Sequence, residues 1–526
     1  MKHIETDCLV IGSGVAGSIY AMEAAKAGLD VTLITGEDEL NKSNSLWAQG
    51  GIIYDNQDKD LFLSDLSVAS SNTSNPKTVE TLVNEGSQIV KDLLIEELQV
   101  PFDRDKTGKL KLTREASHSH PRIIFSKDRT GRTILNSLHK HLYELAAKGN
   151  LKIRTGELAV DLLTPSHSSM NYFDKYYPLR CVGAYVLDTK TNQVNSILSK
   201  KTILATGGIG QIYLHTTNSL AAHGHGIAMA YRVGARIIDM EYVQFHPTVF
   251  HKKGDPPFLI SEAIRGEGGI LVNHSGEAFM ENYHSMGSLA PRDIIARSIH
   301  TELLKSNSES VYIDLSKLKK SYIEKRFPTI YYHLKEAGID MTTEPIPVVP
   351  AAHYSCGGVH SDINGNTNIK NLSVIGEAAC TGIHGANRLA STSLLECVVM
   401  GFKAAQQHYK EINISKDYYL PKVLPWIMPD NKADNDLITQ DLNLIRNTMW
   451  NYVGLVRTTK RLERASNILR ELKNEVDNFY ADNHLTPQLI SLRNAIQTAR
   501  LVTYAAFRNK KSVGSHFRDD TLDHKK

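Results

Sequence analysis

The sequence has few cysteines, no long apolar run and almost no net charge. Its 526 residues include five cysteines, and no two of them form a Cys-x-x-Cys pair. So sparse a set is too small for a disulfide framework or a four-thiolate metal or iron–sulfur site, and it favours a reducing compartment. No stretch of about 18 consecutive apolar residues occurs. The N-terminus also lacks the pattern of a signal peptide, so we expect a cytoplasmic protein without a membrane span.

The charge balance gives no broad electrostatic signal. Lysine and arginine number 60 against 57 aspartates and glutamates, which leaves a formal charge of +3. This balance does not indicate a basic surface for nucleic acid or an anionic membrane, so any anionic ligand must be bound locally. Hydrophobic residues at 41% and charged residues at 22% are typical of a globular protein. The length predicts about three or four domains.

The first part of the chain contains a complete strand–helix–strand pattern. An apolar segment at 4–11 is followed by Gly-Ser-Gly-Val-Ala-Gly at 12–17, a helical stretch and a second apolar segment at 31–34. The glycines permit a tight turn and the close approach of a pyrophosphate, which would lie at the helix N-terminus. A purely structural glycine turn is the alternative. The second strand is followed by Thr35 instead of a ribose-binding acid, and Glu37 lies just beyond.

Two further glycine clusters follow apolar segments much later in the chain. Ala-Thr-Gly-Gly at 205–208 comes after the segment 202–204, and Gly-Glu-Ala-Ala at 376–379 comes after 372–375. Either cluster alone could be a bulge or a tight turn. Together with the first cluster they predict one dinucleotide-binding domain assembled from distant segments. The intervening region 237–351 is rich in His, Arg and Pro, and we expect it to form an inserted cap.

From about residue 421 the pattern becomes helical. Apolar residues recur at helical spacing over 442–456 and 462–472, and Thr486 with Pro487 supplies the cap and first-turn proline of a third helix. Arg457 and the basic residues after it are expected on a solvated helix face. A partner surface is the alternative.

Several polar motifs could bind a small dianion. They bring two histidines and three arginines near glycine turns: Gln244-Phe245-His246-Pro247-Thr248, Ser261-Glu262 with Arg265, Pro291-Arg292-Asp293, His353-Tyr354 and Asn387-Arg388. Arginine offers a planar fork to a carboxylate, and histidine offers a single donor. A structural role is the alternative, in which Arg265 pairs with Glu267 and Arg292 pairs with Asp293. For Arg265 this structural role is the preferred interpretation.

Two loops add further polar groups. A Ser/Asn-rich loop at 43–51 runs into a glycine pair. In a flavin enzyme it would reach the pyrophosphate and the isoalloxazine ring, and an ordinary polar loop is the alternative. The loop 112–120 places Glu115 beside hydroxyls and the imidazoles of His118 and His120. No third ligand at metal-site spacing accompanies these histidines, so no metal is predicted.

These motifs, in this order, resemble those of the flavoprotein family of succinate dehydrogenase and fumarate reductase. The resemblance rests on Q-F-H-P-T, S-E-A-I-R-G-E-G, A-P-R-D, V-P-A-A-H-Y-S-C-G-G-V and G-A-N-R-L-A-S-T-S-L-L-E-C, and it covers nearly the whole chain. Within that family, the segments 112–120 and 453–465 resemble the L-aspartate oxidase branch.

The resemblance implies an α/β fold class. A Rossmann-like FAD-binding domain (1–236 and 352–420) would be interrupted by an α+β capping domain (237–351) and followed by a C-terminal helical bundle domain (421–526).

The resemblance also implies which residues bind FAD. The matching positions are Gly12, Ser13, Gly14, Val15, Ala16, Gly17, Thr35, Asn44, Ser45, Leu46, Trp47, Ala48, Gln49, Gly50, Gly51, Ala205, Thr206, Gly207, Gly208, Glu377, Ser393 and Leu394. Respiratory relatives attach FAD through a histidine at the position of Asn44, so FAD is expected to be non-covalent here. His225 stands where relatives commonly have an aspartate, and Val513 where they often have arginine.

At the substrate end, Arg292 matches the family's catalytic arginine, a proton donor or acceptor. His246, His353 and Arg388 match the residues that hold the substrate carboxylates, and Ser261 is expected to contact the substrate. Glu115 matches an acid of the oxidases that would face the substrate ammonium.

The implied reaction is the FAD-dependent oxidation of L-aspartate to iminoaspartate, the first step of NAD biosynthesis. Dioxygen, giving hydrogen peroxide, or fumarate would accept the electrons, and quinolinate synthase would take the product. One alternative is a fumarate reductase or succinate dehydrogenase flavoprotein. Its respiratory forms should have histidine at position 44 and lack the loop around Glu115. A non-catalytic FAD-binding protein is the other alternative.

Overall fold

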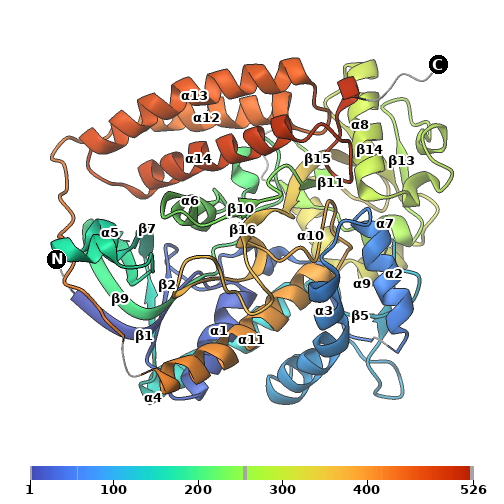
Figure 1. Ribbon diagram of the computed structural model, residues 1–526. Helices are drawn as coiled ribbons and strands as arrows, with labels where there is room; N and C mark the ends of the chain where they lie inside the picture. Colours follow the sequence, from blue (N-terminus) through green and yellow to red (C-terminus); the bar gives the residue numbers. More distant parts are fainter. Residues whose placement is uncertain (1–2, 56, 116, 253–256, 416–417, 522–526) are drawn as a thin grey trace.

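The computed structural model describes residues 3–55, 57–115, 117–252, 257–415 and 418–521 (Figure 1). In these ranges the main element is a seven-stranded sheet of order β6-β2-β1-β9-β8-β7, with β17 paired to β9. Its strands are β1 (His3–Ile11), β2 (Val31–Thr35), β6 (Leu151–Thr155), β7 (Glu157–Leu163), β8 (Gly183–Asp188), β9 (Gln193–Leu204) and β17 (Leu372–Val374).

The register of this sheet explains why the three glycine clusters act together. Strands β1, β9 and β17 are parallel neighbours, and Leu204 is aligned with both Ile11 and Val374. The first residues after these strands therefore lie side by side at the carboxyl edge of the sheet, where ligands of open α/β sheets bind. The predicted assembly of this edge from distant segments is confirmed.

Helices cover the sheet because its strands are apolar on both faces. Strand β2 is buried along its whole length. Helix α1 (Val15–Lys26) begins directly after the first glycine cluster and contacts both α4 (Thr130–Lys148) and α11 (Thr392–Ile414). The start of α1 is therefore fixed at the edge where the glycine clusters meet.

The inserted region has a sheet and an apolar core of its own. The sheet has the order β12-β11-β15-β14-β13, and Figure 1 shows it on the right with its helices, in yellow-green to yellow. The core includes Phe279, Ile299, Phe327 and Leu334. The elements are β11 (Val243–Phe250), β12 (Phe258–Leu259), β13 (Ile270–Val272), β14 (Val311–Asp314), β15 (Ile346–Ser355), α7 (Glu262–Gly266), α8 (Arg292–Ser306), α9 (Lys320–Arg326) and α10 (Pro328–Glu336). The predicted α+β cap is confirmed as a fold, while its limits at 237 and 351 stay a prediction.

Smaller elements complete the FAD-binding part. A three-stranded sheet of order β3-β5-β4 joins the loop after residue 43 to the loop that carries Glu115. The remaining strands and α-helices before residue 421 are β3 (Ile52–Ile53), β4 (Leu112–Thr113), β5 (Ile123–Ile124), β10 (Ile237–Ile238), β16 (Gly358–His360), β18 (Ala379–Cys380), α2 (Lys59–Ala69), α3 (Pro76–Ile89), α5 (Pro165–Ser168) and α6 (His225–Arg232).

Three long helices follow, and Figure 1 shows them side by side at the top in orange and red. They are α12 (Asn435–Val453), α13 (Thr459–Asp482) and α14 (Pro487–Arg508), and α14 packs on α6. The predicted cap of α14 is confirmed, because the side chain of Thr486 accepts a hydrogen bond from the amide of Leu489 at 3.2 Å. None of the helices in the described ranges is long and apolar enough to cross a membrane.

The prediction for Arg457 is wrong. It lies between α12 and α13 and is fully buried. The chain reverses here, and the guanidinium donates to the carbonyls of Val453 and Gly454 at 3.2 and 3.1 Å and to that of Glu241 at 2.7 Å. The first helix also ends at Val453, short of the expected 456, and Arg457 caps its free carbonyls.

Candidate active site

A cavity of about 390 Å³ connects the glycine edge of the sheet to the cap. Among the expected cofactor residues, those that line it are Gly12, Ser13, Gly14, Val15, Ala16, Thr35, Asn44, Ser45, Trp47, Ala48, Gln49, Gly50, Gly51, Ala205, Thr206, Gly207, Glu377, Ser393 and Leu394. All six expected substrate residues line it too: Glu115, His246, Ser261, Arg292, His353 and Arg388. The structure therefore brings both predicted sets into one cavity.

Three expected cofactor residues do not line the cavity. Gly17 and Gly208 are glycines for packing: a Cβ on Gly17 would lie 2.1 Å from the carbonyl oxygen of Gly12, and one on Gly208 would lie 2.2 Å from a carboxylate oxygen of Glu377. Leu46 is partly buried against the core. Gly17 and Gly208 thus permit the close packing of Gly12 and Glu377, which line the cavity themselves.

The glycine end has the chemistry of a dinucleotide site. Helix α1 starts at this end from Gly14, which has no side chain to cap it, and the amide of Val15 donates to the hydroxyl of Ser45 at 3.3 Å. Gly12 adopts φ +113°, and a Cβ there would lie 2.3 Å from the carbonyl oxygen of Ala205. Among the described residues, the buried hydroxyls of Ser43 and Thr206 have no hydrogen-bond partner. Free amides and unpaired donors at a helix N-terminus fit the pyrophosphate of FAD.

Asn44 is held within the same cavity by two hydrogen bonds of its side-chain amide. Its side-chain oxygen accepts from the amide of Ser219 at 2.7 Å, which leaves its nitrogen to donate to Glu377. Burial raises the pKa of Glu377 to about 7, although the amide of Ser355 donates to it at 3.1 Å. An amide side chain is no nucleophile, so residue 44 offers no atom for a covalent bond to the flavin.

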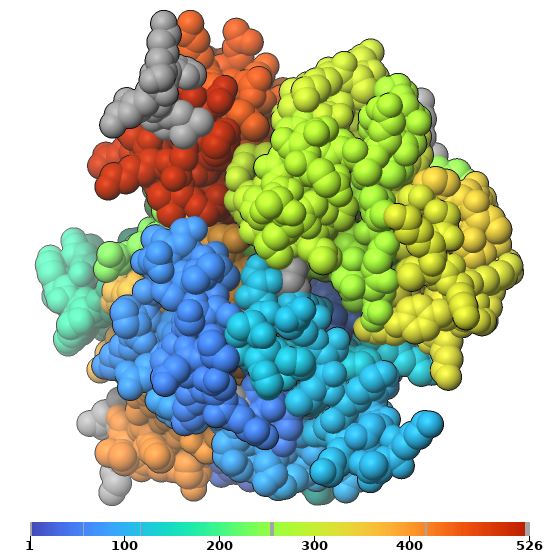
Figure 2. Space-filling model, turned by 90° about the vertical axis from the view of Figure 1, so that its right-hand side faces the viewer, coloured from blue at the N-terminus to red at the C-terminus, as the bar shows by residue number. Residues whose placement is uncertain are grey.

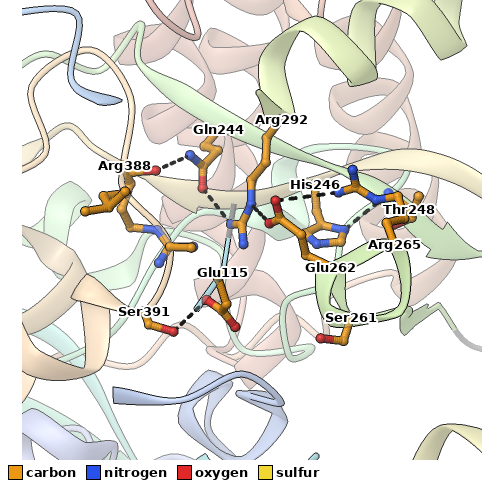
Figure 3. Close-up of polar contacts among 12 residues, drawn as sticks. Glu115, Gln244, His246, Thr248, Ser261, Glu262, Arg265, Arg292, Arg388 and Ser391 are labelled. Atoms are coloured by element: carbon orange, nitrogen blue, oxygen red, sulfur yellow. Dashed lines mark hydrogen bonds and ion pairs between the residues drawn. The ribbon is translucent and has the colours of Figure 1, made fainter. Parts of the chain in front are cut away.

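Arg292 stands at the cap end as the first residue of α8. Its Nε donates to Glu262 at 2.5 Å and its Nη1 donates to Gln244 at 3.3 Å (Figure 3). Burial acts to raise the pKa of Glu262, but Arg292 and Arg265 more than offset this, and the pKa of Glu262 lies below its usual value. Glu262 is therefore an ionised partner that fixes the orientation of Arg292.

The structural alternative named the wrong partners for both Arg265 and Arg292. Asp293 pairs with Arg297 at 2.8 Å, and Glu267 pairs with Arg326 at 3.3 Å. Arg265 has the structural role that the sequence favoured, because it is buried and donates to the carbonyl of Ser288 at 2.7 Å; its acid is Glu262, at 3.8 Å.

His246 and His353 face each other with ring centres 5.2 Å apart. Burial, with nearby arginines, keeps the pKa of both imidazoles well below the usual value, so both are neutral. The amide of Thr248 donates to Nδ1 of His246 at 3.2 Å, which places the ring proton on Nε2. Pro247 lacks an N–H, and the ladder between β11 and β15 shifts register after His246.

Gln244 connects the two arginines of the site. Its Nε2 donates to the side-chain oxygen of Asn387 at 2.7 Å and to the carbonyl of Arg388 at 2.9 Å, so its oxygen must face Arg292. Arg388 itself donates to Ser393 at 3.1 Å. Gln244 thus joins the cap to the backbone of Arg388 while it orients the side chain of Arg292.

Glu115 approaches the cavity from the other side. It accepts a hydrogen bond from Ser391 at 2.7 Å, and burial raises its pKa (Figure 3). Gly50 makes room for it, since a Cβ on Gly50 would lie 2.5 Å from its carboxylate. Ser391 adopts φ +59° just before α11. Ala116 lies outside the described residues.

Neither histidine of the same loop lines the cavity. His118 is buried, hydrogen-bonds to the carbonyl of Ala390 at 3.0 Å, and has a pKa lowered by burial to about 4. His120 is exposed. Across the described ranges, no three His, Cys, Asp or Glu side chains gather in a way that could hold a metal ion. All five cysteines are free.

A second cavity of about 140 Å³ adjoins the first. Gln49, Gly50, Glu115 and Ser261 line both. Figure 2 shows a hollow on this face, where the light-blue and cyan segment meets the yellow-green cap. The substrate end thus lies at the boundary between the cap and the FAD-binding part.

Sequence reasoning missed the residues that orient the site. Gln244, Glu262 and Tyr354 belong to the motifs that were singled out, yet no role was assigned to them, and Ser391 was not singled out as a site residue. The sequence indicates them only in that they are polar residues in the same motifs as His246, Arg265 and His353. Their roles follow only from the tertiary contacts.

Known proteins share both this sequence and this fold. The family profile of the FAD binding domain matches residues 7–394, and that of the fumarate reductase flavoprotein C-terminal region matches 443–525. An L-aspartate oxidase of Ralstonia nicotianae is 40% identical, covering 98% of this chain and 95% of that protein. The chloroplastic L-aspartate oxidase of Oryza sativa is 39% identical, covering 98% and 81%. The solved quinol fumarate reductase chain of E. coli superposes with a TM-score of 0.86 at 25% identity, covering 98% and 92%.

The chain belongs to the FAD-binding flavoprotein family of succinate dehydrogenase and fumarate reductase. Within that family it belongs to the L-aspartate oxidases, and it is an FAD-dependent oxidoreductase.

Proposed function

We propose that the chain oxidises L-aspartate to iminoaspartate at the cap end of the cavity, with the roles assigned to individual residues below. The supporting observation is the convergence of two neutral imidazoles, two guanidiniums and the carboxylates of Glu115 and Glu262 at one end of a glycine-lined cavity.

Three side chains would hold the substrate carboxylates. The neutral imidazoles of His246 and His353 each donate one N–H, and Arg388 donates through its planar fork. Ser261 lies beside them in the cavity wall. Because L-aspartate has two carboxylates, donors on both the cap and the FAD-binding part can be engaged at once.

Glu115 would select the amino acid over succinate. A carboxylate beside the substrate nitrogen stabilises an ammonium, and succinate has no such charge. Glu115 is the carboxylate that lines the cavity opposite the ion pair of Arg292 and Glu262 (Figure 3). Ser391 and Gly50 keep it in place.

Formation of iminoaspartate removes a hydride from Cα and a proton from the nitrogen. FAD, when bound, accepts the hydride. Arg292 is assigned the proton transfer. Since a guanidinium stays protonated at neutral pH, Arg292 can move a proton only by releasing one to a neighbour as it gains another, and Glu262 at 2.5 Å is that neighbour. Contact between the cap and the FAD-binding part excludes water from the imine.

FAD would be held without a covalent bond, because Asn44 offers no nucleophile. Dioxygen, giving hydrogen peroxide, or fumarate would take up the electrons, and quinolinate synthase would consume the product. Acid precipitation of the purified yellow protein tests the first point: flavin should appear wholly in the supernatant. Flavin that stays with the precipitate would contradict it.

The activity is tested by anaerobic reduction of the purified enzyme. L-Aspartate should bleach the flavin absorbance, whereas succinate at the same concentration should not. Bleaching by succinate alone would make the chain a dicarboxylate dehydrogenase and would remove the role given to Glu115.

A further inference from the structure

Arg388 rests on a buried aromatic ring. Its guanidinium carbon lies 4.6 Å from the ring centre of Tyr354. Arg388 is 6% exposed and Tyr354 is 7% exposed. One guanidinium nitrogen donates to Ser393, but Nε has no hydrogen-bond partner among the described residues. The ring face therefore determines much of the orientation of this side chain.

A buried carboxylate holds the hydroxyl of Tyr354 from behind. The hydroxyl donates to Glu396 at 3.1 Å, and Glu396 also accepts from Thr381 at 2.7 Å and from His384 at 2.8 Å. Glu396 is 1% exposed. Burial acts to raise the pKa of Glu396, but His384 and these hydrogen bonds more than offset it, and its pKa lies below the usual value. Glu396 is ionised at neutral pH.

The ring transmits the effect of this charge. A phenol that donates to a carboxylate is polarised toward a phenolate, and electron density on the ring face rises. A cation over that face is then attracted more strongly, and the low dielectric of a buried site strengthens the attraction. Glu396 can thus act on Arg388 through Tyr354.

We propose that Tyr354 and Glu396 are positioning residues for substrate binding: the polarised ring holds the guanidinium of Arg388 in the orientation that binds a carboxylate. This inference rests on the proposed role of Arg388 as a carboxylate ligand. It adds two residues to those that determine dicarboxylate affinity.

The test measures the Kd of malonate for the FAD-loaded enzyme through the shift in flavin absorbance. Malonate has two carboxylates and no ammonium. It has a single methylene carbon, so it cannot be oxidised to an alkene. Tyr354→Phe and Glu396→Gln should each raise the Kd about five- to tenfold, and Tyr354→Leu about thirtyfold. The kcat for L-aspartate at saturation should change less than about twofold, since binding of the ground state and of the transition state weakens equally.

Tyr185→Phe is the matched control. Tyr185 is also a buried tyrosine, and its hydroxyl donates to the carbonyl of Leu424 at 2.7 Å, away from the cavity. Its loss should leave the malonate Kd unchanged. FAD content and Tm are recorded for every variant. Should Glu396→Gln fail to fold, Tyr354→Phe, which removes a single oxygen, decides the question.

Double variants separate positioning from general support of the fold. If Glu396 acts through the hydroxyl, Tyr354→Phe/Glu396→Gln should bind malonate as weakly as either single variant. In an Arg388→Gln background neither change should matter further. Additive effects would overturn the inference, as would unchanged Kd values in both single variants when Arg388→Gln itself binds weakly. Unchanged binding by Arg388→Gln would instead overturn the proposed role of Arg388.

Discussion

Glu115 must be ionised to attract an ammonium, yet burial raises its pKa. As the pH falls through this raised pKa, the carboxylate is protonated and loses that attraction. We therefore expect kcat/KM for L-aspartate to fall on the acid side at a higher pH than an ordinary glutamate would produce. Glu115→Gln should remove this dependence and lower kcat/KM about 100-fold, while malonate binding stays within about twofold. Steady-state rates and malonate titration against pH check this; a retained acid limb in the variant would assign it to another group.

Glu377 makes a second pH-dependent contribution, to the stability of the FAD-free protein. Its pKa is about 7 in the folded chain, above the unfolded value, so its stabilising contribution is present below the unfolded pKa and is lost as pH rises through about 7. Glu377→Gln should therefore raise the free energy of unfolding of the FAD-free protein at alkaline pH, by at most about 3 kcal/mol. The difference from the wild type should vanish in acid. Urea titrations at both pH values measure it, and a difference independent of pH would contradict the assignment.

At the scale of single elements, the start of α1 depends on Gly17. A Cβ there would lie 2.1 Å from the carbonyl oxygen of Gly12, so Gly17→Ala must displace the helix from the strand. We expect the purified variant to lose most of its FAD, measured as the ratio of flavin to protein absorbance. Gly28→Ala is the control: Gly28 adopts φ +92° with open space around it, so alanine costs about 1 kcal/mol of strain without touching the cavity. Equal FAD loss in both variants would mean that general destabilisation is responsible.

The strand–turn–helix elements could be predicted because their determinants are local. Glycines after apolar segments mark the turns of β1, β9 and β17, and Thr486 marks the start of α14 by its own side chain. Gln244 and Ser391 could not be assigned, because their roles depend on partners far along the chain. Polar type and neighbouring motifs suggest such residues, but only the packing of the cap on the sheet pairs them.

At the scale of the whole molecule, the prediction that Arg457 lies on a solvated helix face is wrong. It shows that helical periodicity alone does not predict burial where the chain reverses direction. A basic residue between two amphipathic helices has the pattern of a solvated face. Here the end of α12 lies next to Glu241 of the cap. The backbone carbonyls of Gly454 and Glu241 are buried there, and the guanidinium of Arg457 donates to both. The sequence contains no local sign of that contact.

The same residue provides a test of how the helical part is joined to the rest. Arg457→Leu removes a donor from each of three carbonyls. That of Gly454 loses its partner, while those of Val453 and Glu241 keep the hydroxyl of Tyr213 and the amide of Val243. We expect the free energy of unfolding to fall by about 3 kcal/mol. Arg470→Ala, an exposed position on α13, should change it by less than about 0.5 kcal/mol. Urea unfolding followed by fluorescence measures both. A small effect of Arg457→Leu would show that water replaces the guanidinium.

The order of strands in the main sheet determines when the protein can first hold its cofactor. Strand β17 pairs with β9, but the entire cap lies between them in the chain. During synthesis the N-terminal segments emerge first, and the cap, which has its own core, can fold before β17 leaves the ribosome. Pairing across so long an insertion is entropically slow. Glu377, Ser393 and Leu394 therefore join the cavity only after the cap has been made, and a nascent chain that ends within the cap has only an incomplete site for flavin.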